Sequence, residues 1–285
     1  MQLAHRFQGE VINCDSMQVY RGFDIGTDKL SFQAREGIPH HLLDMVDPEI
    51  QFTAADFARA ASTAARKITA RGGLPLVTGG TGLYLKALIH GLFPEGRKDD
   101  RIRLQLNGEA QRLGIHAMWE QLEEVDPAYA QKIGPRDGMR ILRALEVYRA
   151  TGRPISEHFL HTRSLVADFH VIKLGLELER AELYARINQR VDRMFAAGII
   201  EETQRILASG VDEEAPPFRA LGYQQVLGLL RGKLTPEEAI ELTKRETRHY
   251  AKRQMTWFRK MPGILWFSPS DLEGLSEHLT QQLKS

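Results

Sequence analysis

Two segments of this 285-residue chain share one pattern, in which a short apolar run is followed by a turn of polar and glycine residues. In residues 9–29 a β-branched run leads to Asp15, and in residues 74–88 the run LPLVT leads directly to GGTG. An apolar run without alternating polar residues is typical of a strand that is buried on both faces of a parallel sheet. The repeated strand and turn, each followed by a helical pattern, predict an α/β fold.

Composition limits the partners and the environment of the chain. The apolar fraction of 42% and the charged fraction of 26% are those of an ordinary globular protein. The formal net charge is +1, so a polyanionic partner must be held by local basic clusters. The single cysteine, Cys14, excludes an internal disulfide, and no CxxC or Cys/His cluster suggests zinc, so a reducing cytoplasm fits. No apolar run reaches the length of a membrane span, so we expect no membrane partner.

Asp15 stands where the first strand is expected to end. Ligands of α/β sheets bind at the carboxyl ends of strands, so a carboxylate at this place is a candidate general base. Ser16, Gln18 and Tyr20 follow it and add polar groups. The alternative is that Asp15 caps the segment after the strand, which is a common role of aspartate. The residues alone leave both roles open.

The second turn, GGTG, is a candidate anion site. Gly79 and Gly80 allow backbone N–H groups to approach an anion, and the helix that follows favours negative charge at its N-terminus. Thr81 offers a hydroxyl at the same point. The alternative is a plain turn in which Thr81 is the helix cap.

Two adjacent histidines, His40 and His41, invite a metal-binding interpretation. Neighbouring side chains in extended backbone point to opposite sides, so one ion cannot easily use both. Partner ligands with the spacing of a metal site are missing. We therefore predict no metal ligands among these residues.

Short helical segments without convincing strands fill the middle of the sequence. They predict a helical insertion domain over residues 99–168, set into an α/β core domain made of residues 1–98 and 169–285. A further strand at 169–178 is expected to return the chain to the sheet. Thr53 with Asp56 resembles a capping box.

The most informative helix of the insertion covers residues 139–152, opened by Asp137. Arg140 and Arg143 are three residues apart on one flank. Two such arginines can clamp phosphates through paired hydrogen bonds. They can equally form a solvated face, as surface charges usually do.

Two helices of the C-terminal half carry basic faces. Arg186, Arg190 and Arg193 recur at spacings of four and three. The last long helix, about 236–260 and capped by Thr235, has one basic face with the following residues: Arg245, Arg248, His249, Lys252, Thr256 and Arg259. Its other, packing face consists of Ala239, Ile240, Tyr250, Ala251, Trp257 and Phe258.

The basic face of this last helix contains few acidic residues. Its charges should therefore repel one another unless an anionic partner screens them, which favours binding to a polyanion. Gln254 lies within the opposite, apolar face and is expected to need a buried hydrogen-bond partner.

Five blocks of the sequence, taken in order, resemble the bacterial tRNA dimethylallyltransferases, also called tRNA isopentenyltransferases. The blocks are CDSMQVYRGFDIGTDK, PHHLLDMVDP, VTGGTGLYLKAL, RILRALEVYRATGRPIS and AKRQMTWFRK, and they span nearly the whole chain. The resemblance implies a P-loop kinase-like parallel-sheet core with a helical insertion. It implies transfer of a dimethylallyl group from dimethylallyl diphosphate to N6 of the adenosine 3′-adjacent to the anticodon, with Mg²⁺ as cofactor. The expected partners are the tRNA anticodon stem-loop and dimethylallyl diphosphate, and the expected state is a cytoplasmic monomer.

The resemblance also implies roles for single residues. Asp15 matches the general base of the family, and Arg190 matches the arginine associated with catalysis and with the diphosphate. Positions associated with substrate tRNA are Asp15, Ser16, Met17, Gln18, Thr81, Arg103, Met139, Arg140, Ile141, Leu142 and Arg143. Met139 stands where the family usually has glutamine, which removes one amide contact. Arg245, Arg248 and Lys252 of the basic face are expected to hold tRNA phosphates.

The sequence lacks one motif of the family, a P-loop of the GPTxxGKT type, since no GxxxxGK[ST] occurs in it. We expect the first strand and the diphosphate cradle to lie upstream of Met1, and we expect weak or no transfer by this chain with tRNA binding retained. Two alternatives come from other classes: a tRNA-binding module without catalysis, and a nucleoside or nucleotide phosphotransferase that holds ATP at the GGTG turn.

Overall fold

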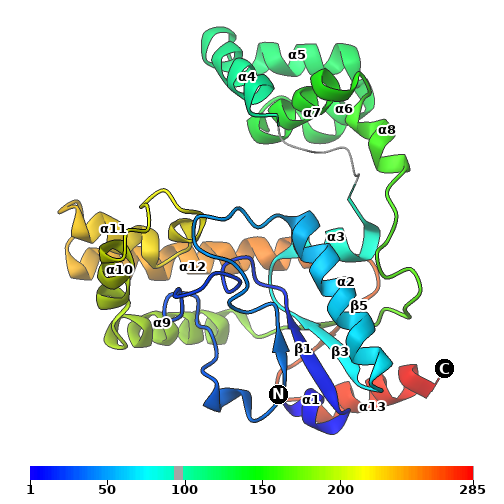
Figure 1. Ribbon diagram of the computed structural model, residues 1–285, viewed down its shortest axis with the longest axis vertical. Helices are drawn as coiled ribbons and strands as arrows, with labels where there is room; N and C mark the ends of the chain where they lie inside the picture. Colours follow the sequence, from blue (N-terminus) through cyan, green and yellow to red (C-terminus); the bar gives the residue numbers. More distant parts are fainter. Residues whose placement is uncertain (93–98, 285) are drawn as a thin grey trace. The chain divides into compact units, whose positions relative to one another are not determined.

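A computed structural model describes residues 1–92 and 99–284 of the chain (Figure 1). It divides into two compact units, Met1–Ile89 with Asp168–Ser285, and His90–Ala167. The sequence placed the domain boundaries at 98/99 and 168/169, and the first of these adjoins residues 93–98, which lie outside the described residues.

A parallel sheet of three strands lies in the first unit (Figure 1). In the order β2-β1-β3, its strands are β1 (Gly9–Asn13), β2 (His40–His41) and β3 (Leu74–Thr78). Ile12 of β1 pairs with His41 on one side and with Val77 on the other. Helix α1 (Gln2–Arg6) precedes the sheet, and α2 (Ala54–Ala70) packs against β1 and β3. The predicted α/β class is confirmed.

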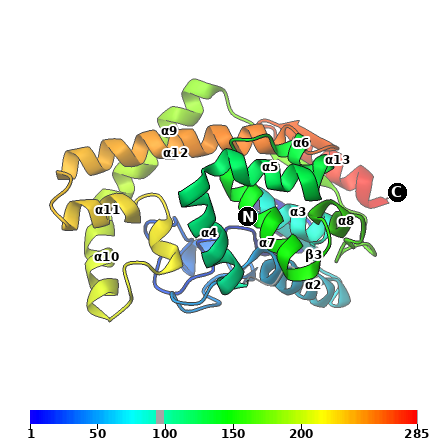
Figure 2. The same cartoon turned by 90° about the horizontal axis from the view of Figure 1, so that it is seen from above.

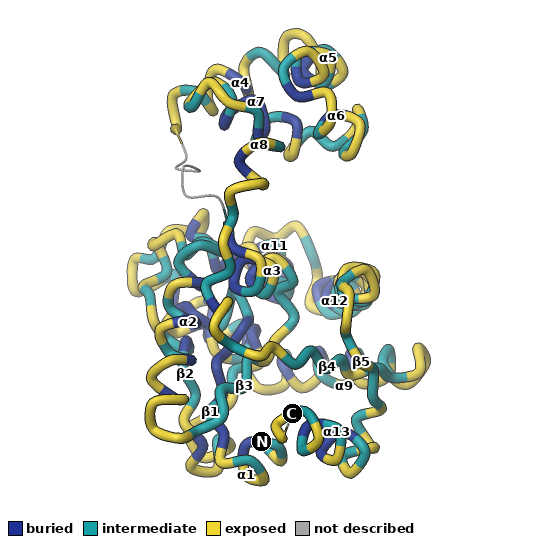
Figure 3. Tube along the Cα trace, turned by 90° about the vertical axis from the view of Figure 1, so that its right-hand side faces the viewer, coloured by how far each residue is buried: buried dark blue, intermediate teal, exposed yellow. Residues whose placement is uncertain are grey.

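The central strand β1 is the buried one (Figure 3). Val11, Ile12 and Asn13 are all buried, whereas the residues of β3 are half-buried and Thr78 is exposed. The prediction of a strand at 74–78 is confirmed. The prediction that both of its faces are buried is wrong, since none of its residues is buried; β3 is also an edge strand of this sheet.

A second, two-stranded parallel sheet pairs β4 (Lys173–Leu176) with β5 (Ile264–Phe267). The expected strand at 169–178 exists but is shorter. It pairs with β5 and not with the three-stranded sheet, so the expectation that it rejoins that sheet is wrong.

Helices surround these strands in the first unit. Besides α1 and α2 they are α3 (Gly82–His90), α9 (Arg180–Ala196), α10 (Ile199–Ala208), α11 (Tyr223–Leu230), α12 (Pro236–Phe258), α13 (Leu272–Lys284) and the short 3₁₀ turns Gln33–Arg35 and Pro216–Arg219. Helices α9 and α12 lie side by side (Figure 2). The predicted capping boxes are confirmed, at Thr53 with Asp56 for α2 and at Thr235 with Glu238 for α12.

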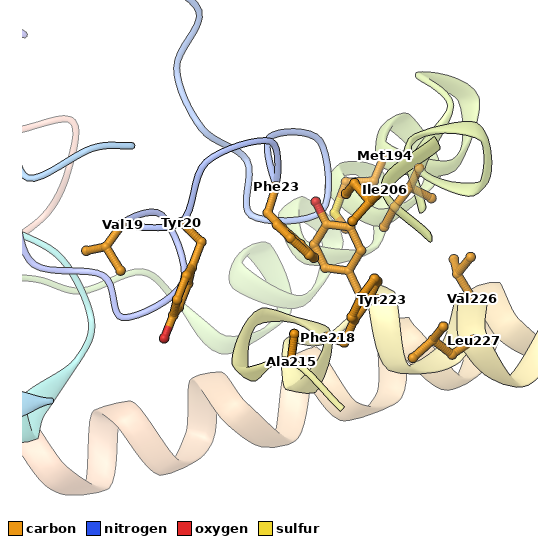
Figure 4. Close-up of a cluster of buried hydrophobic side chains, with 11 residues drawn as sticks. Val19, Tyr20, Phe23, Met194, Ile206, Ala215, Phe218, Tyr223, Val226 and Leu227 are labelled. Carbon is orange, nitrogen blue, oxygen red and sulfur yellow. The ribbon is translucent and has the colours of Figure 1, made fainter. Parts of the chain in front are cut away.

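The loop that follows β1 is part of a hydrophobic core. Val19 and Phe23 of this loop are fully buried among residues of α9, α10 and α11 (Figure 4). The ring of Phe23 meets the rings of Phe218 and Tyr223 edge to face, with centroids 5.0 and 4.9 Å apart. Such pairs add to the stabilisation from apolar burial, so the side chains of this loop are anchored in the core.

The second unit is helical throughout its described residues, 90–92 and 99–167. Its helices are α4 (Asp100–Leu113), α5 (Ile115–Val125), α6 (Pro127–Ile133), α7 (Gly138–Thr151) and α8 (Ile155–Leu160). Leu106, Met118 and Leu122 are fully buried and form the core of this unit with Ile141 of α7. Asp137 caps α7 as predicted. Within the described ranges of the whole chain, no helix has the length and apolar character that crossing a membrane needs.

The contacts of Glu10 on β1 with His41 of β2 and with Arg71 give a pH-dependent test of the sheet. Burial alone would raise the pKa of Glu10, but hydrogen bonds from Arg71 and His41 outweigh it and lower this pKa below its usual 4.5. Because the folded-state pKa is the lower one, this stabilisation is complete above pH 4.5 and is lost as the pH falls through the folded-state value. We expect Glu10→Gln to reduce the free energy of unfolding at pH 7 by about 1–2 kcal/mol, and by much less near pH 3.

Urea denaturation at several pH values measures this difference. The exposed Glu49→Gln is the matched control, for which we expect no such dependence on pH. A loss for Glu10→Gln that stays the same from pH 7 to pH 3 contradicts the assignment.

Candidate active site

Asp15 lies two residues beyond the end of β1, and one of its carboxylate oxygens is engaged. Oδ1 accepts hydrogen bonds from the backbone N–H groups of Met17 (2.7 Å) and Gln18 (3.3 Å). Among the described residues no hydrogen bond reaches Oδ2. The capping role that the sequence left open is therefore present, and the second oxygen remains available to a ligand.

The carboxyl ends of β1 and β3 meet at this point. Cys14 N–H donates to Thr78 O (2.7 Å), and Thr81 N–H donates to Cys14 O (3.2 Å). A Cβ at Gly79 would lie only 2.3 Å from Cys14 O, so the two backbones approach as closely as glycine allows. Burial raises the pKa of the Cys14 thiol, and the charge of Asp15 adds to this, so the thiol stays protonated. Its role is that of a small buried apolar group.

This meeting brings together predicted site residues from both turns. The hydroxyl of Thr81 accepts a hydrogen bond from the backbone N–H of Ser16 (3.1 Å) and lies 3.5 Å from the Ser16 hydroxyl. Asp15 to Gln18 and Thr81 thus form one continuous surface, as the sequence pattern predicts for the ends of parallel strands.

A pocket of about 210 Å³ opens beside Asp15. It is lined by Val11, Asn13, Asp15, Gln18, Leu30, His40, Leu43, Thr78 and Gly79. This volume is smaller than the roughly 300–1,000 Å³ of typical ligand sites, so the pocket suits one end of a ligand.

Helix α12 borders the same turn. Gln254 Nε2 donates to Gly80 O (3.0 Å), which confirms the prediction that this glutamine needs a partner. A Cβ at Gly82 would lie 2.2 Å from the Trp257 ring nitrogen, so the helix lies against the turn. Burial raises the pKa of the Tyr250 hydroxyl, and the charge of Asp15 adds to this effect. Ala239 of the predicted packing face is fully buried, but Tyr250 and Trp257 are 39% and 41% exposed, so this face packs only in part.

Arg190 is connected to Gln18 through residues 27 and 28. Gln18 Nε2 donates to Thr27 O (2.9 Å), and Arg190 Nε forms an ion pair with Asp28 Oδ2 (3.1 Å). The structure therefore links the predicted base-reading and diphosphate-binding side chains through one short loop.

The basic face of α12 has acidic and polar partners that the sequence argument missed. Arg245 pairs with Glu246 (3.1 Å), and Arg259 pairs with Glu177 of the distant β4 region. Arg248 donates to Asn188 of α9 (2.7 Å). The expectation of uncompensated charge is therefore wrong for Arg245 and Arg259, which have carboxylate partners, whereas the partner of Arg248 is a neutral amide.

The predicted tRNA residues of the second unit differ in exposure. Arg103 and Met139 are exposed, and Met139 is 84% exposed. Ile141 is fully buried in the core of this unit, and Leu142 is half-buried. Arg140 pairs with Asp137 (3.2 Å) and Arg143 with the buried Glu146 (3.0 Å). These two arginines thus already have carboxylate partners within α7 or at its cap.

The sequence model of one protein family, described as IPP transferase, matches residues 18–261. This chain belongs to the IPP transferase family. The tRNA dimethylallyltransferase of Geobacter sulfurreducens is 46% identical over 277 residues, which cover 97% of this chain and 89% of that protein. The tRNA dimethylallyltransferase of Thermomicrobium roseum is 43% identical over 288 residues, which cover 100% of this chain and 87% of that protein.

Solved structures that this chain resembles are also tRNA prenyltransferases. The tRNA isopentenylpyrophosphate transferase of Bacillus halodurans is 38% identical, with a TM-score of 0.72 over 99% of this chain and 91% of that chain. A eukaryotic dimethylallyltransferase acting on tRNA is 32% identical, with a TM-score of 0.80 over 99% of this chain and 73% of that chain. The resemblance seen in the five sequence blocks is confirmed, and the IPP transferase family is one of enzymes.

The arrangement of His, Cys, Asp and Glu side chains shows whether protein groups alone could hold a metal ion in this member of the IPP transferase family. Within residues 1–92 and 99–284, no group of three or more His, Cys, Asp and Glu side chains is arranged to hold a metal ion. His40 contacts Ile38 O (2.9 Å) and His41 contacts Glu10 (2.6 Å), so the two rings have separate partners. A cage made of protein groups alone does not fit these residues.

Sequence reasoning missed two polar residues that line the pocket, Asn13 and His40. Asn13 is buried, and its Nδ2 donates to Leu42 O (3.3 Å). An asparagine inside a β-branched run was the available signal, because a buried amide needs partners. His40 comes to the pocket through the pairing of β2 with β1, which the local pattern does not encode.

The approach of Gly79 to Cys14 gives a test of how the site is assembled. We expect Gly79→Ala to reduce the free energy of unfolding by more than about 2 kcal/mol, because the new methyl group would meet a backbone carbonyl that cannot move alone. Gly108→Ala in the interior of α4 is the control, since nothing lies within 4 Å of its Cβ position, and alanine there should stabilise by about 0.5–1 kcal/mol. Thermal unfolding followed by circular dichroism measures both. Equal midpoints for the two variants contradict the close approach.

Proposed function

We propose that this protein transfers a dimethylallyl group from dimethylallyl diphosphate to N6 of the adenosine 3′-adjacent to the anticodon of tRNA. The observation that carries the proposal is Asp15, whose Oδ1 is fixed by two backbone N–H groups while Oδ2 is left for a ligand beside a pocket. Membership of the IPP transferase family and the names of its relatives support the reaction.

Asp15 acts as the general base in this proposal. The lone pair of adenine N6 is delocalised into the ring, so the amine is a poor nucleophile. As the N6–C bond forms and the C–O bond to diphosphate breaks, the N6 proton passes to Asp15 and the electron pair leaves with diphosphate. A positioned carboxylate of this kind contributes about 10²–10⁴ in rate.

The target base must leave the stack of the loop to reach Asp15. Gln18 is suited to reading the edge of a flipped base, because its amide nitrogen is already bonded to Thr27 O and its orientation is thereby fixed. Its amide oxygen then remains to accept a hydrogen bond from the base. Thr81 and Ser16 extend the same surface toward the neighbouring nucleotides.

Arg190 is the candidate for stabilising the leaving diphosphate. It contacts Asp28 through Nε, and a guanidinium has four further N–H groups that can face phosphate oxygens. Mg²⁺ belongs to the proposal as an ion that the diphosphate carries, because proteins usually hold it through one or two carboxylates and substrate phosphates. When bound, the ion would neutralise charge on the diphosphate, and we assign it no other role.

Asp15→Asn separates catalysis from binding. We expect the rate of dimethylallyl transfer to an anticodon stem-loop to fall by about 10²–10⁴, because the base is lost, while the Kd for the stem-loop changes less than about twofold. Incorporation of labelled dimethylallyl with protein in excess measures the rate, and filter binding measures the Kd.

Each alternative has its own result in this experiment. Stem-loop binding with no incorporation by the parent chain contradicts the proposed transfer; it is the result expected both of a tRNA-binding module and of a transferase that lacks the P-loop motif. ATP hydrolysis with no stem-loop binding at low salt favours a nucleotide phosphotransferase. Full activity of Asp15→Asn shows that another group is the base.

Arg103, an exposed arginine of the second unit, allows a test of contact with tRNA phosphates. We expect Arg103→Ala to weaken stem-loop binding and to reduce the slope of log K against log salt by about 0.7–0.9, the value for one lost phosphate contact. The exposed Lys67→Ala on α2 is the control and should leave the slope unchanged. Identical slopes for the parent and Arg103→Ala argue against a phosphate contact.

A further inference from the structure

Glu202 of α10 is a buried carboxylate that the proposed reaction does not use. It is 2% exposed, and its oxygens accept hydrogen bonds from the backbone N–H groups of Ile25 (3.0 and 3.1 Å) and Asp24 (3.3 Å). The hydroxyl of Tyr223 donates a third, short hydrogen bond. Among the described residues no cation pairs with Glu202. Burial of a carboxylate is costly unless hydrogen bonds compensate it, and here the compensating donors are the loop backbone and Tyr223.

Tyr223 of α11 extends this contact to the next residue of the loop. The side chain is fully buried, and its hydroxyl oxygen accepts a hydrogen bond from Gly26 N–H (3.2 Å). Burial and the negative charge of Glu202 raise the pKa of Tyr223, so it remains a donor. A Cβ at Gly26 would lie 2.4 Å from the Tyr223 ring, so the loop backbone lies directly on the ring. Three successive N–H groups, of residues 24, 25 and 26, are thus held by one pair of side chains.

The residues that follow are those that contact the predicted site. Thr27 O accepts the hydrogen bond from Gln18 Nε2, and Asp28 forms the ion pair with Arg190. Asp28 has a φ of +57°, in the left-handed region that aspartate adopts more readily than most residues other than glycine. The next residue, Lys29, has a buried side chain that binds Asp24, Asp44 and Tyr20 O.

We infer that Glu202 and Tyr223 are positioning residues for dimethylallyl transfer: by holding residues 24–26 they set the orientation of Gln18 toward the target base and of Arg190 toward the diphosphate. This inference rests on the proposed function. A carboxylate and a hydroxyl fix the direction of backbone N–H groups, whereas apolar packing would only exclude water. Phe23, packed against Tyr223, supplies that apolar part separately.

Two conservative variants, Glu202→Gln and Tyr223→Phe, test the inference. Each keeps the volume of the side chain and removes hydrogen bonds to the loop. Thr203→Val is the matched control, because Thr203 is equally buried on α10 and, among the described residues, its hydroxyl bonds only to Ile199 O (2.8 Å) within the helix. Circular dichroism and thermal unfolding identify the variants that fold like the parent.

The first measurement is steady-state transfer to the stem-loop. We expect both loop variants to lower kcat about tenfold and to raise the KM for dimethylallyl diphosphate, with the Kd for the stem-loop changed less than twofold, since phosphate contacts dominate that affinity. In a Gln18→Ala background the effect of Glu202→Gln on kcat should fall to less than threefold, because its partner at the site is already absent. Additive losses in this cycle, or losses equal to those of Thr203→Val, overturn the inference.

The second measurement does not depend on transfer. A stem-loop with 2-aminopurine in place of the target adenine becomes brighter when the base leaves the stack. We expect the parent chain and Thr203→Val to produce this increase on binding, and Glu202→Gln and Tyr223→Phe to produce less than half of it. Equal brightening by all four proteins overturns the inference alone, whereas a parent chain that neither brightens the probe nor transfers the group contradicts the proposed function and the inference with it.

Discussion

The close approach of two backbones, Cys14 at the end of β1 and Gly79 at the end of β3, is the constraint on which the rest of the site depends. It allows Thr81 to reach Ser16 with its hydroxyl and Cys14 with its N–H group. Helix α12 then contacts the same turn through Gln254. Each of these contacts is short and direct because a glycine leaves no side chain between the two strand ends. The candidate active site is therefore formed by the carboxyl ends of β1 and β3 together and not by any one loop.

Asp15 shows how one side chain can serve structure and, in the proposed reaction, chemistry as well. The sequence offered capping and proton transfer as alternatives, yet a carboxylate has two oxygens, and here the backbone N–H groups take only one of them. The capping bonds fix the side chain, so its free oxygen has a defined direction toward the pocket. Preorganisation of this kind reduces the entropy that must be lost when a substrate binds.

Local signals predicted the local features of the structure. The capping residues Thr53, Asp137 and Thr235, and the need of Gln254 for a polar partner, follow from patterns within a few residues, and the structure agrees with them. Long-range partners could not be predicted in this way. Arg259 meets an acid 82 positions away, and the strand after residue 169 pairs with a strand that no pattern marked. Hydrophobic periodicity tells which face is buried but not against which element, so the basic face of α12 and the burial of β3 were misjudged.

The loop of residues 23–28 takes its shape from residues that occur far later in the chain. Gly26 and Tyr223 are 197 positions apart, so during synthesis the N-terminal strands leave the ribosome well before the groups that complete the loop. At roughly 5–20 residues per second this delay is about 10–40 s. Val19 and Phe23, which are fully buried in the finished protein, lack their partners from α10 and α11 for that whole interval. For that interval the segment that follows β1 exposes apolar side chains that the folded protein buries, so its final conformation depends on the C-terminal half of the chain.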